Sequence, residues 1–303
     1  MTTLQELRSW AHSLGPKRVG LVVADDDVGL QAVAGAAQLN LAFPVLIGDE
    51  PRTRSKIVEL GIEASLQHAT FISAGDSAAA AQLAVRMVRE GAIDLLLKGH
   101  LRTDQLLRAA LDKETGLRTG RLLSDVLLYE DTLSGARRLV GITDGGINVA
   151  PNLEQKKEIL HNALAVLHAI GIARPKIAIM SATEAVTDSV PSTVDAAKLA
   201  EMGAAGEFGD CDVFGPLALD NALLESAAQV KGIHSPVAGH ADCMLVPNIE
   251  AGNLLGKAVK YLGGSECAHV VVGAKAPILI PSRVESVDDK LNSIALGVMA
   301  CGR

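Results

Sequence analysis

Short aliphatic runs alternate with longer amphipathic segments along the whole chain. The runs have strand length and end at glycine, proline or polar residues, whereas the segments between them carry apolar residues at helical spacing. Strands are expected at 19–24, 44–48, 70–74, 93–98, 126–129, 138–143, 176–181, 213–219, 243–247, 269–273 and 277–280. Helices are expected at 29–41, 77–89, 103–112, 153–170, 193–202, 221–229, 251–262 and from 288 onward. This alternation predicts an α/β fold with mainly parallel sheets and right-handed crossovers.

The composition agrees with this fold class. The 303 residues are enough for two α/β domains or one large one. Hydrophobic residues make up 49% of the chain and aromatic residues only 2%, so the core must consist of alanine, valine, leucine and isoleucine, as is typical of helices on a parallel sheet. The net charge of −7 and the scarcity of aromatic residues argue against a nucleic-acid surface.

The cysteines and the N-terminus indicate a reduced, cytoplasmic setting. The 4 cysteines show no C-x-x-C spacing and no histidine partner at metal-binding distance, so we expect buried or surface thiols. The first residues lack the long apolar stretch of a signal peptide. No apolar run reaches the roughly 18 residues that a membrane span needs.

The most informative segment lies near the C-terminus. The apolar run 277–280 leads into Ser282 and Arg283, and Asp289 then opens a helix. Ligands of open α/β sheets bind at the carboxyl ends of strands, and an arginine facing a helix N-terminus suits an anion such as phosphate. Asp289, or its neighbour Asp288, would take a proton there. Alternatively, Ser286 and Asp289 form only a helix-capping box.

The order Ser-Arg-x-x-Ser-x-x-Asp at 282–289 resembles the C-terminal signature of the phosphate acetyl/butyryltransferases. Further segments agree with that family along nearly the whole chain: 98–103, 113–124, 143–148, 215–220, 235–239 and 247–253. The run 113–120 and the tail, with Val284 and Lys290, look more like the butyryl branch.

The resemblance implies reversible acyl transfer between coenzyme A and inorganic phosphate, with an acetyl or butyryl group. It also implies two α/β domains around a cleft, at 1–129 plus 273–303 and at 130–272, with the C-terminal segment returning to the first. The family forms dimers or larger assemblies, so a homo-oligomer is expected. The preferred length of the acyl chain and the physiological direction of the reaction stay open.

The same resemblance assigns site residues. Ser282 and Arg283 are expected at the reacting centre, and Asp289 aligns with the acid that the acetyl branch is thought to use as a base toward the thiol. The remaining substrate-binding candidates for coenzyme A or phosphate are Lys98, Thr103, Arg118, Ser124, Asp144, Asn148, Asp220 and Gly239. Lys98 ends a strand, and Arg118 lies in a glycine-flanked loop that would let backbone approach a phosphate. Alternatively, Asp220 has only a structural role as a turn-forming residue.

Nucleotide and metal motifs are missing. The segment 252–258 has three residues between its glycines where a P-loop needs four, and Ala258 replaces the serine or threonine. His240 has no second histidine four residues on. We therefore expect no metal and no cofactor, with the coenzyme A thioester as substrate. Two rival readings are a non-catalytic acyl-CoA-sensing domain and a metal- and NAD-dependent hydroxy-acid dehydrogenase of related architecture.

Overall fold

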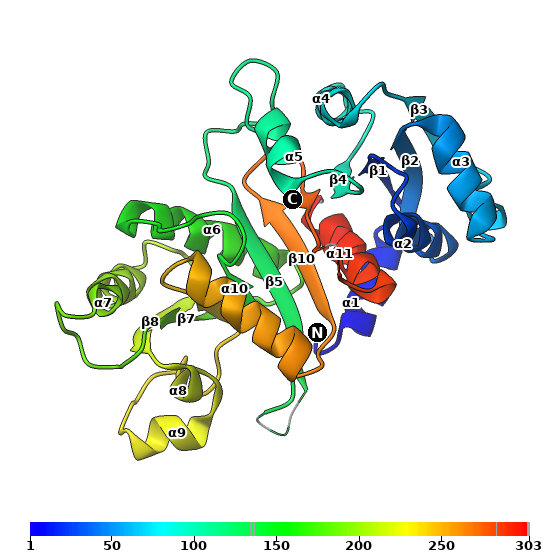
Figure 1. Cartoon of the computed structure of the whole chain (residues 1–303). Coiled ribbons are helices and arrows are strands. Elements are labelled where there is room, and N and C mark those ends of the chain that lie inside the picture. The colour runs from blue at the N-terminus through cyan, green and yellow to red at the C-terminus, as the bar shows by residue number, and fades with distance from the viewer. Residues whose placement is uncertain (134, 136, 283, 302–303) are drawn as a thin grey trace. The chain divides into compact units, whose positions relative to one another are not determined.

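The computed structural model describes residues 1–133, 135, 137–282 and 284–301. The chain divides into two compact units (Figure 1). Unit 1 comprises Met1–Leu4 and Leu122–Cys267, and unit 2 comprises Gln5–Arg121 and Ala268–Arg303. The C-terminal segment thus belongs with the N-terminal part of the chain, as expected. The domain boundaries expected near 129 and 273 stay a prediction.

The strands of unit 2 follow the order β3-β2-β1-β4-β11-β10. They are β1 (Lys17–Val22), β2 (Ala42–Gly48), β3 (Thr70–Ser73), β4 (Leu95–Lys98), β10 (Cys267–Val272) and β11 (Ile278–Leu279). Neighbours pair in parallel from β3 to β11, and β10 pairs antiparallel with β11. β4 is buried along its whole length, which explains its continuous aliphatic sequence.

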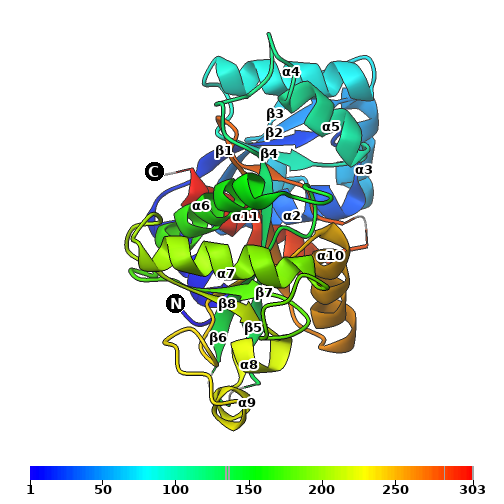
Figure 2. The same cartoon turned by 90° about the vertical axis from the view of Figure 1, so that its left-hand side faces the viewer.

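Helices cover both faces of these strands. They are α1 (Leu4–Ser13), α2 (Asp27–Gln38), α3 (Glu50–Glu59), α4 (Ser77–Arg89), α5 (Thr103–Ala110) and α11 (Val287–Ala300), with a 3-10 turn at Ala64–Leu66. Figure 2 shows α4 and α5 above the strands and α2 and α11 below them. α11 is buried from Asp289 to Met299, so its polar N-terminal residues must find partners inside the protein.

Unit 1 has the strand order β5-β6-β9-β7-β8. The strands are β5 (Ser124–Asp131), β6 (Arg138–Thr143), β7 (Lys176–Met180), β8 (Asp212–Leu217) and β9 (Cys243–Leu245). The helices are α6 (Leu153–Ala169), α7 (Pro191–Ala204), α8 (Leu219–Leu223), α9 (Glu225–Val230) and α10 (Ile249–Lys257), which a π-helical turn at Ala258–Leu262 continues. β6, β9, β7 and β8 are parallel, and β5 pairs antiparallel with β6.

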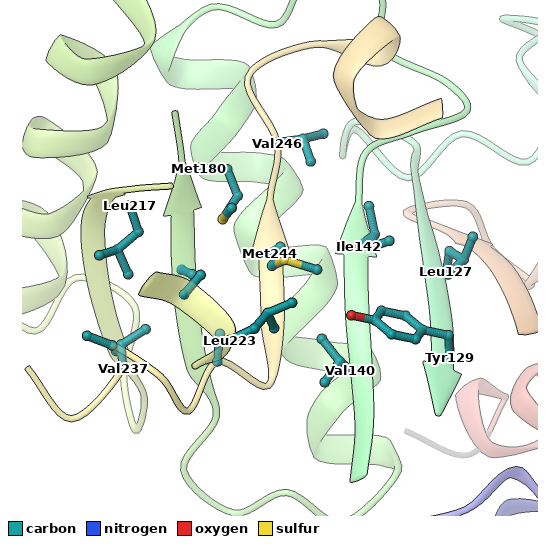
Figure 3. Close-up of a cluster of buried hydrophobic side chains, with 14 of the residues drawn as sticks. Leu127, Tyr129, Val140, Ile142, Met180, Leu217, Leu223, Val237, Met244 and Val246 are labelled. Carbon is teal, nitrogen blue, oxygen red and sulfur yellow. The ribbon is translucent and has the colours of Figure 1, made fainter. Parts of the chain in front are cut away.

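A cluster of mainly aliphatic side chains, joined by Tyr129, forms one core of unit 1. Figure 3 shows Tyr129, Val140, Met244 and Leu217 along the strands, with Leu223 of α8 reaching the same cluster. These side chains are nearly inaccessible to solvent. The core confirms the prediction of an interior built from aliphatic rather than aromatic residues.

The fold differs from the sequence expectation in two respects. α1 and α3 were not predicted; α3 buries only Thr53 and Ile57 among its described residues, so its sequence lacks a clear apolar face. The pairs β5–β6 and β10–β11 are antiparallel, because the connections between them are too short for the crossover that parallel strands require. The mainly parallel α/β class itself is confirmed.

Candidate active site

A pocket in unit 2 lies where β4 and β11 end. The two strands are parallel, and Leu279 pairs with Leu97, so Lys98 and Ile280 leave the sheet at the same edge. The pocket has a volume of about 650 Å³ and is lined by Lys98, Leu101, Arg102, Thr103, Asp104, Leu107, Ile280, Pro281 and Ser282. Three residues predicted from the sequence, Lys98, Thr103 and Ser282, therefore share one pocket. Its position at the carboxyl ends of strands matches the usual ligand site of such sheets.

Lys98 brings a buried cation to this pocket. The residue is 5% exposed, and its Nζ lies 3.4 Å from the Gly99 carbonyl oxygen and 3.5 Å from that of Leu101. Gly99 permits this turn, because a Cβ there would lie 2.3 Å from the carbonyl oxygen of Val23. A buried ammonium group beside an open pocket is suited to an anionic ligand.

The N-terminus of α5 forms another wall. Thr103 is its first residue, and the helix has 8 residues. Arg102, just before it, donates from Nε to Oδ1 of Asp104 over 2.8 Å. That hydrogen bond and the charge of Arg102 lower the pKa of Asp104, so Asp104 is ionised at neutral pH and balances Arg102. The start of α5 and the Lys98 ammonium group thus line the same pocket, where both favour an anion.

Ser282 stands at the end of the loop that leaves β11. It is half-buried, and its carbonyl oxygen accepts a hydrogen bond from the Glu285 N–H at 3.2 Å. This hydrogen bond ties the backbone of Ser282 to Glu285. Arg283, its predicted partner at the reacting centre, lies outside the described residues.

Asp289 is fully buried at the third position of α11. Its Oδ2 accepts from the Ser286 Oγ at 2.6 Å and from the Ser286 N–H at 3.0 Å, and its own N–H donates to Ser286 Oγ at 3.1 Å. The expected capping box is therefore present. Asp289 is not among the described residues that line the pocket, and its role as a base stays a prediction. Asp288 is exposed and pairs with Arg8 at 3.0 Å.

Arg118 is exposed on a loop that is joined to the segment before β11. It forms an isolated antiparallel bridge with Ala274, and Thr119 donates its hydroxyl to the Gly273 carbonyl at 2.6 Å. The preceding Gly116 is required, because a Cβ would lie 2.4 Å from the Asp112 carbonyl oxygen. The loop backbone is thus fixed, and the Arg118 side chain is left accessible to a ligand.

In unit 1, Ser124, Asp144 and Asn148 come together at the carboxyl end of β6. Asp144 Oδ1 accepts from the N–H groups of Gly146 and Ile147, both at 2.9 Å, and Oδ2 accepts from the Asn148 N–H at 3.0 Å and Nδ2 at 2.6 Å. Both carboxylate oxygens therefore organise the loop 145–148.

Burial raises the pKa of the Asp144 carboxyl, and the nearby Asp125 carboxylate raises it further, whereas the hydrogen bonds from Gly146, Asn148 and Ile147 lower it. The buried Ser124 accepts from Asn162 Nδ2 at 2.8 Å. Asp144 therefore holds the loop 145–148 from within the protein.

Asp220 and Gly239 lie on other elements of unit 1. Asp220 is exposed in the first turn of α8, and its Oδ2 is 3.6 Å from Lys231 Nζ. Gly239 has φ +79°, and a Cβ there would lie 2.5 Å from the backbone of Glu225. Its neighbours Ala238 and His240 line a second pocket of about 410 Å³. Gly239 is therefore required for close packing against α9.

The sequence is similar to proteins of known name. A family model described as Phosphate acetyl/butaryl transferase matches residues 77–298. A phosphate acetyltransferase from Rhizobium meliloti is 40% identical over 278 residues, which is 92% of this chain and 87% of that protein. The chain belongs to the phosphate acetyl/butyryltransferase family. A phosphate butyryltransferase from Clostridium beijerinckii is 38% identical over 298 residues, 98% of this chain and 97% of that protein.

Solved structures of the family share the fold. A branched-chain phosphotransacylase from Enterococcus faecalis V583 superposes with a TM-score of 0.81 at 28% identity, covering 95% of this chain and 99% of that one. Neither the acyl-CoA-sensing domain nor the hydroxy-acid dehydrogenase is supported by these relatives. In the described part of the chain, no helix is long and apolar enough to cross a membrane, and no group of three or more His, Cys, Asp or Glu residues could hold a metal ion.

For a phosphate acetyl/butyryltransferase, sequence reasoning missed two ion pairs of unit 2. The buried Lys290 Nζ pairs with Oδ2 of the half-buried Asp26 at 2.7 Å and so joins the start of α11 to the start of α2. His269 faces the buried Glu285 behind the Ser282 turn. No local pattern marks these pairs, since their members are far apart in the sequence. Leu107, by contrast, lines the pocket from a helix that the sequence does predict, so knowing the position of that helix is enough to place it.

Proposed function

We propose that the protein catalyses the reversible reaction of an acyl-CoA with inorganic phosphate to give an acyl phosphate and coenzyme A, with an acetyl or butyryl group. The observation that carries this proposal is the pocket in which Lys98, the N-terminus of α5 and Ser282 meet. Membership of the phosphate acetyl/butyryltransferase family supports the same reaction.

The pocket supplies the groups that phosphate and a thioester need. Lys98 and the N–H groups of α5, beside Thr103, bind the phosphate. A phosphate oxygen attacks the thioester carbonyl carbon, the new C–O bond forms as the C–S bond breaks, and coenzyme A leaves as a thiolate that takes up a proton. Ser282 donates its hydroxyl to the carbonyl oxygen or the departing sulfur, and Arg283 stabilises the negative charge that develops there.

No covalent acyl-enzyme is required, because phosphate is itself the nucleophile in a ternary complex. Holding both reactants in place contributes up to roughly 7–11 kcal/mol to lowering the barrier. In the reverse direction, Asp289 takes the proton of the coenzyme A thiol. The same carboxylate accepts a hydrogen bond from Ser286 in the capping box, which restrains it. Substitutions at Asp289 can distinguish its role as a base from its role as a helix cap.

The other predicted residues serve substrate binding in this proposal. Arg118 offers an exposed guanidinium to a phosphate group of coenzyme A. Asp144 holds the loop 145–148, whose Asn148 contacts coenzyme A or phosphate. The expected contact of Ser124 with substrate is not proposed, because Ser124 is fully buried and is held by Asn162. Asp220 and Gly239 shape further parts of the binding surface.

The reaction as proposed uses no metal and no redox cofactor, because each step is a proton or acyl transfer. We further propose that the protein works in the cytoplasm as a homo-oligomer. The 4 cysteines are free thiols, three of them buried, which is typical of a reducing compartment. Light scattering that reports a stable 31.5 kDa species at micromolar concentration would contradict the oligomer.

The test of the reaction is phosphate-dependent release of thiol. Purified protein is mixed with acetyl-, propionyl- or butyryl-CoA, with and without phosphate, and free thiol is measured. The proposal requires release that saturates with phosphate for at least one of these thioesters. If thiol is released from none of them, the proposed function is wrong.

A further inference from the structure

The turn that carries Ser282 ends on a buried carboxylate. The N–H of Glu285 donates to the Ser282 carbonyl oxygen at 3.2 Å, so the position of the Ser282 backbone depends on where Glu285 is held. The Glu285 side chain is only 8% exposed. Its Oε2 is buried and has no hydrogen-bond partner among the described residues. A carboxylate in such a place needs a compensating group.

His269 of β10 lies where its imidazole ring can interact with the buried Glu285 carboxylate. Its Nε2 lies 3.5 Å from Glu285 Oε1, and its side chain is 18% exposed. The histidine is itself anchored, because its backbone N–H donates to Ser293 Oγ at 2.9 Å. Ser293 in turn donates to the Asp289 carbonyl oxygen at 2.8 Å. These hydrogen bonds tie the backbone of β10 at His269 to α11.

We propose that His269 and Glu285 are a positioning pair that sets the place of Ser282 in the pocket. Neither residue is among the described residues that line the pocket, so they act through the turn and not on the substrate. This inference rests on the proposed function. A shift of about 1 Å in a positioned group can cost about 100-fold in rate, so loosening the turn lowers kcat while leaving substrate binding nearly intact.

The experiment uses Glu285→Gln, His269→Gln and the double variant. Glu285→Gln keeps the size of the side chain and removes its charge. The matched control is Glu59→Gln, since Glu59 ends α3 with an exposed side chain that pairs with Lys56 at 3.2 Å, away from the residues that line the pocket. Each single variant is expected to lower kcat about 10–100-fold with the KM for acyl-CoA within twofold. The double variant should be no slower than the slower single variant, and the control should match the wild type.

Hydrogen exchange provides a readout that does not depend on turnover. The amide of Glu285 should exchange about tenfold faster in both single variants, because its hydrogen bond to Ser282 opens more often. The inference is overturned if the kcat of folded Glu285→Gln stays within twofold of wild type, if the losses in the single variants multiply in the double, or if the Glu285 amide is unaffected. If one variant fails to fold, the other is judged by the same measures. If the wild type shows no transacylase activity, the proposed function is wrong. The hydrogen exchange of the Glu285 amide would then be the only test of whether His269 and Glu285 position Ser282.

Discussion

Replacing Lys98 with methionine tests whether the buried cation binds phosphate. Methionine keeps an unbranched side chain of similar length and removes the ammonium group, whose contacts with the Gly99 and Leu101 carbonyls, at 3.4 and 3.5 Å, are long. A volume-conserving change of this kind should alter the free energy of unfolding by less than about 1.5 kcal/mol. The variant is therefore expected to fold and to show its defect in binding.

The size of the expected effect follows from the hydrogen bond to phosphate that Lys98→Met removes. A hydrogen bond to a charged group contributes about 1.5–3 kcal/mol, and about 1.4 kcal/mol corresponds to a factor of ten in a binding constant. The KM for phosphate should therefore rise about 10–100-fold in Lys98→Met, while the KM for acyl-CoA stays within about threefold.

The assay is the initial rate of thiol release at varied phosphate and saturating acyl-CoA, with the melting temperature measured on the same samples. Lys17→Met is the matched control, because Lys17 begins β1 at the opposite, amino end of a strand parallel to β4. It should leave both KM values unchanged. A folded Lys98→Met with a KM for phosphate within twofold of wild type would refute the assignment of Lys98.

Substitutions at three further residues address the remaining roles. Arg283→Ala should lower kcat by roughly 100–1,000-fold, the loss typical of one oxyanion donor, and Arg283→Lys should recover little of it because a point charge does not replace the two-pronged contact; steady-state rates check both. Asp289→Ala should destabilise the protein by about 1 kcal/mol through loss of the Ser286 cap, whereas Asp289→Asn should keep most of that stability. A loss of activity in folded Asp289→Asn, with a flattened acidic limb of the pH–rate profile, identifies the base, and retained activity leaves only the cap. Because the folded pKa of Asp144 is raised, the stability it contributes is present below the unfolded pKa, about 3.9, and is lost as the pH rises through the folded pKa. Melting temperatures from pH 3.5 upward should therefore fall in wild type relative to Asp144→Asn over that window, and parallel curves would contradict the raised pKa.

Several strands could be predicted because they are mainly buried aliphatic runs with glycine, proline or a polar residue at their ends. β4 shows this well, since all four of its residues are buried. The order of the strands could not be predicted in the same way. β11 lies beside β4 although the two strands are far apart in the sequence, and the sequence of neither strand indicates this pairing. Only the family resemblance indicated the return of the C-terminal segment.

The same limit applies to the candidate site. Lys98 and Ser282 stood out because Lys98 ends one strand and Ser282 follows another, and they share a pocket only because β4 and β11 are parallel neighbours. The capping box of Asp289 was predictable from its local spacing. The buried pair of Lys290 and Asp26 was not, because it depends on how α11 packs against α2.

A crystal structure of the protein with coenzyme A and phosphate would show whether the pocket beside Lys98 and Ser282 binds both substrates. We expect a phosphate oxygen within hydrogen-bond distance, about 2.7–3.2 Å, of Lys98 Nζ and of an N–H at the start of α5, with the coenzyme A sulfur next to Ser282. Phosphate bound away from Lys98, or a coenzyme A sulfur remote from Ser282, would contradict it.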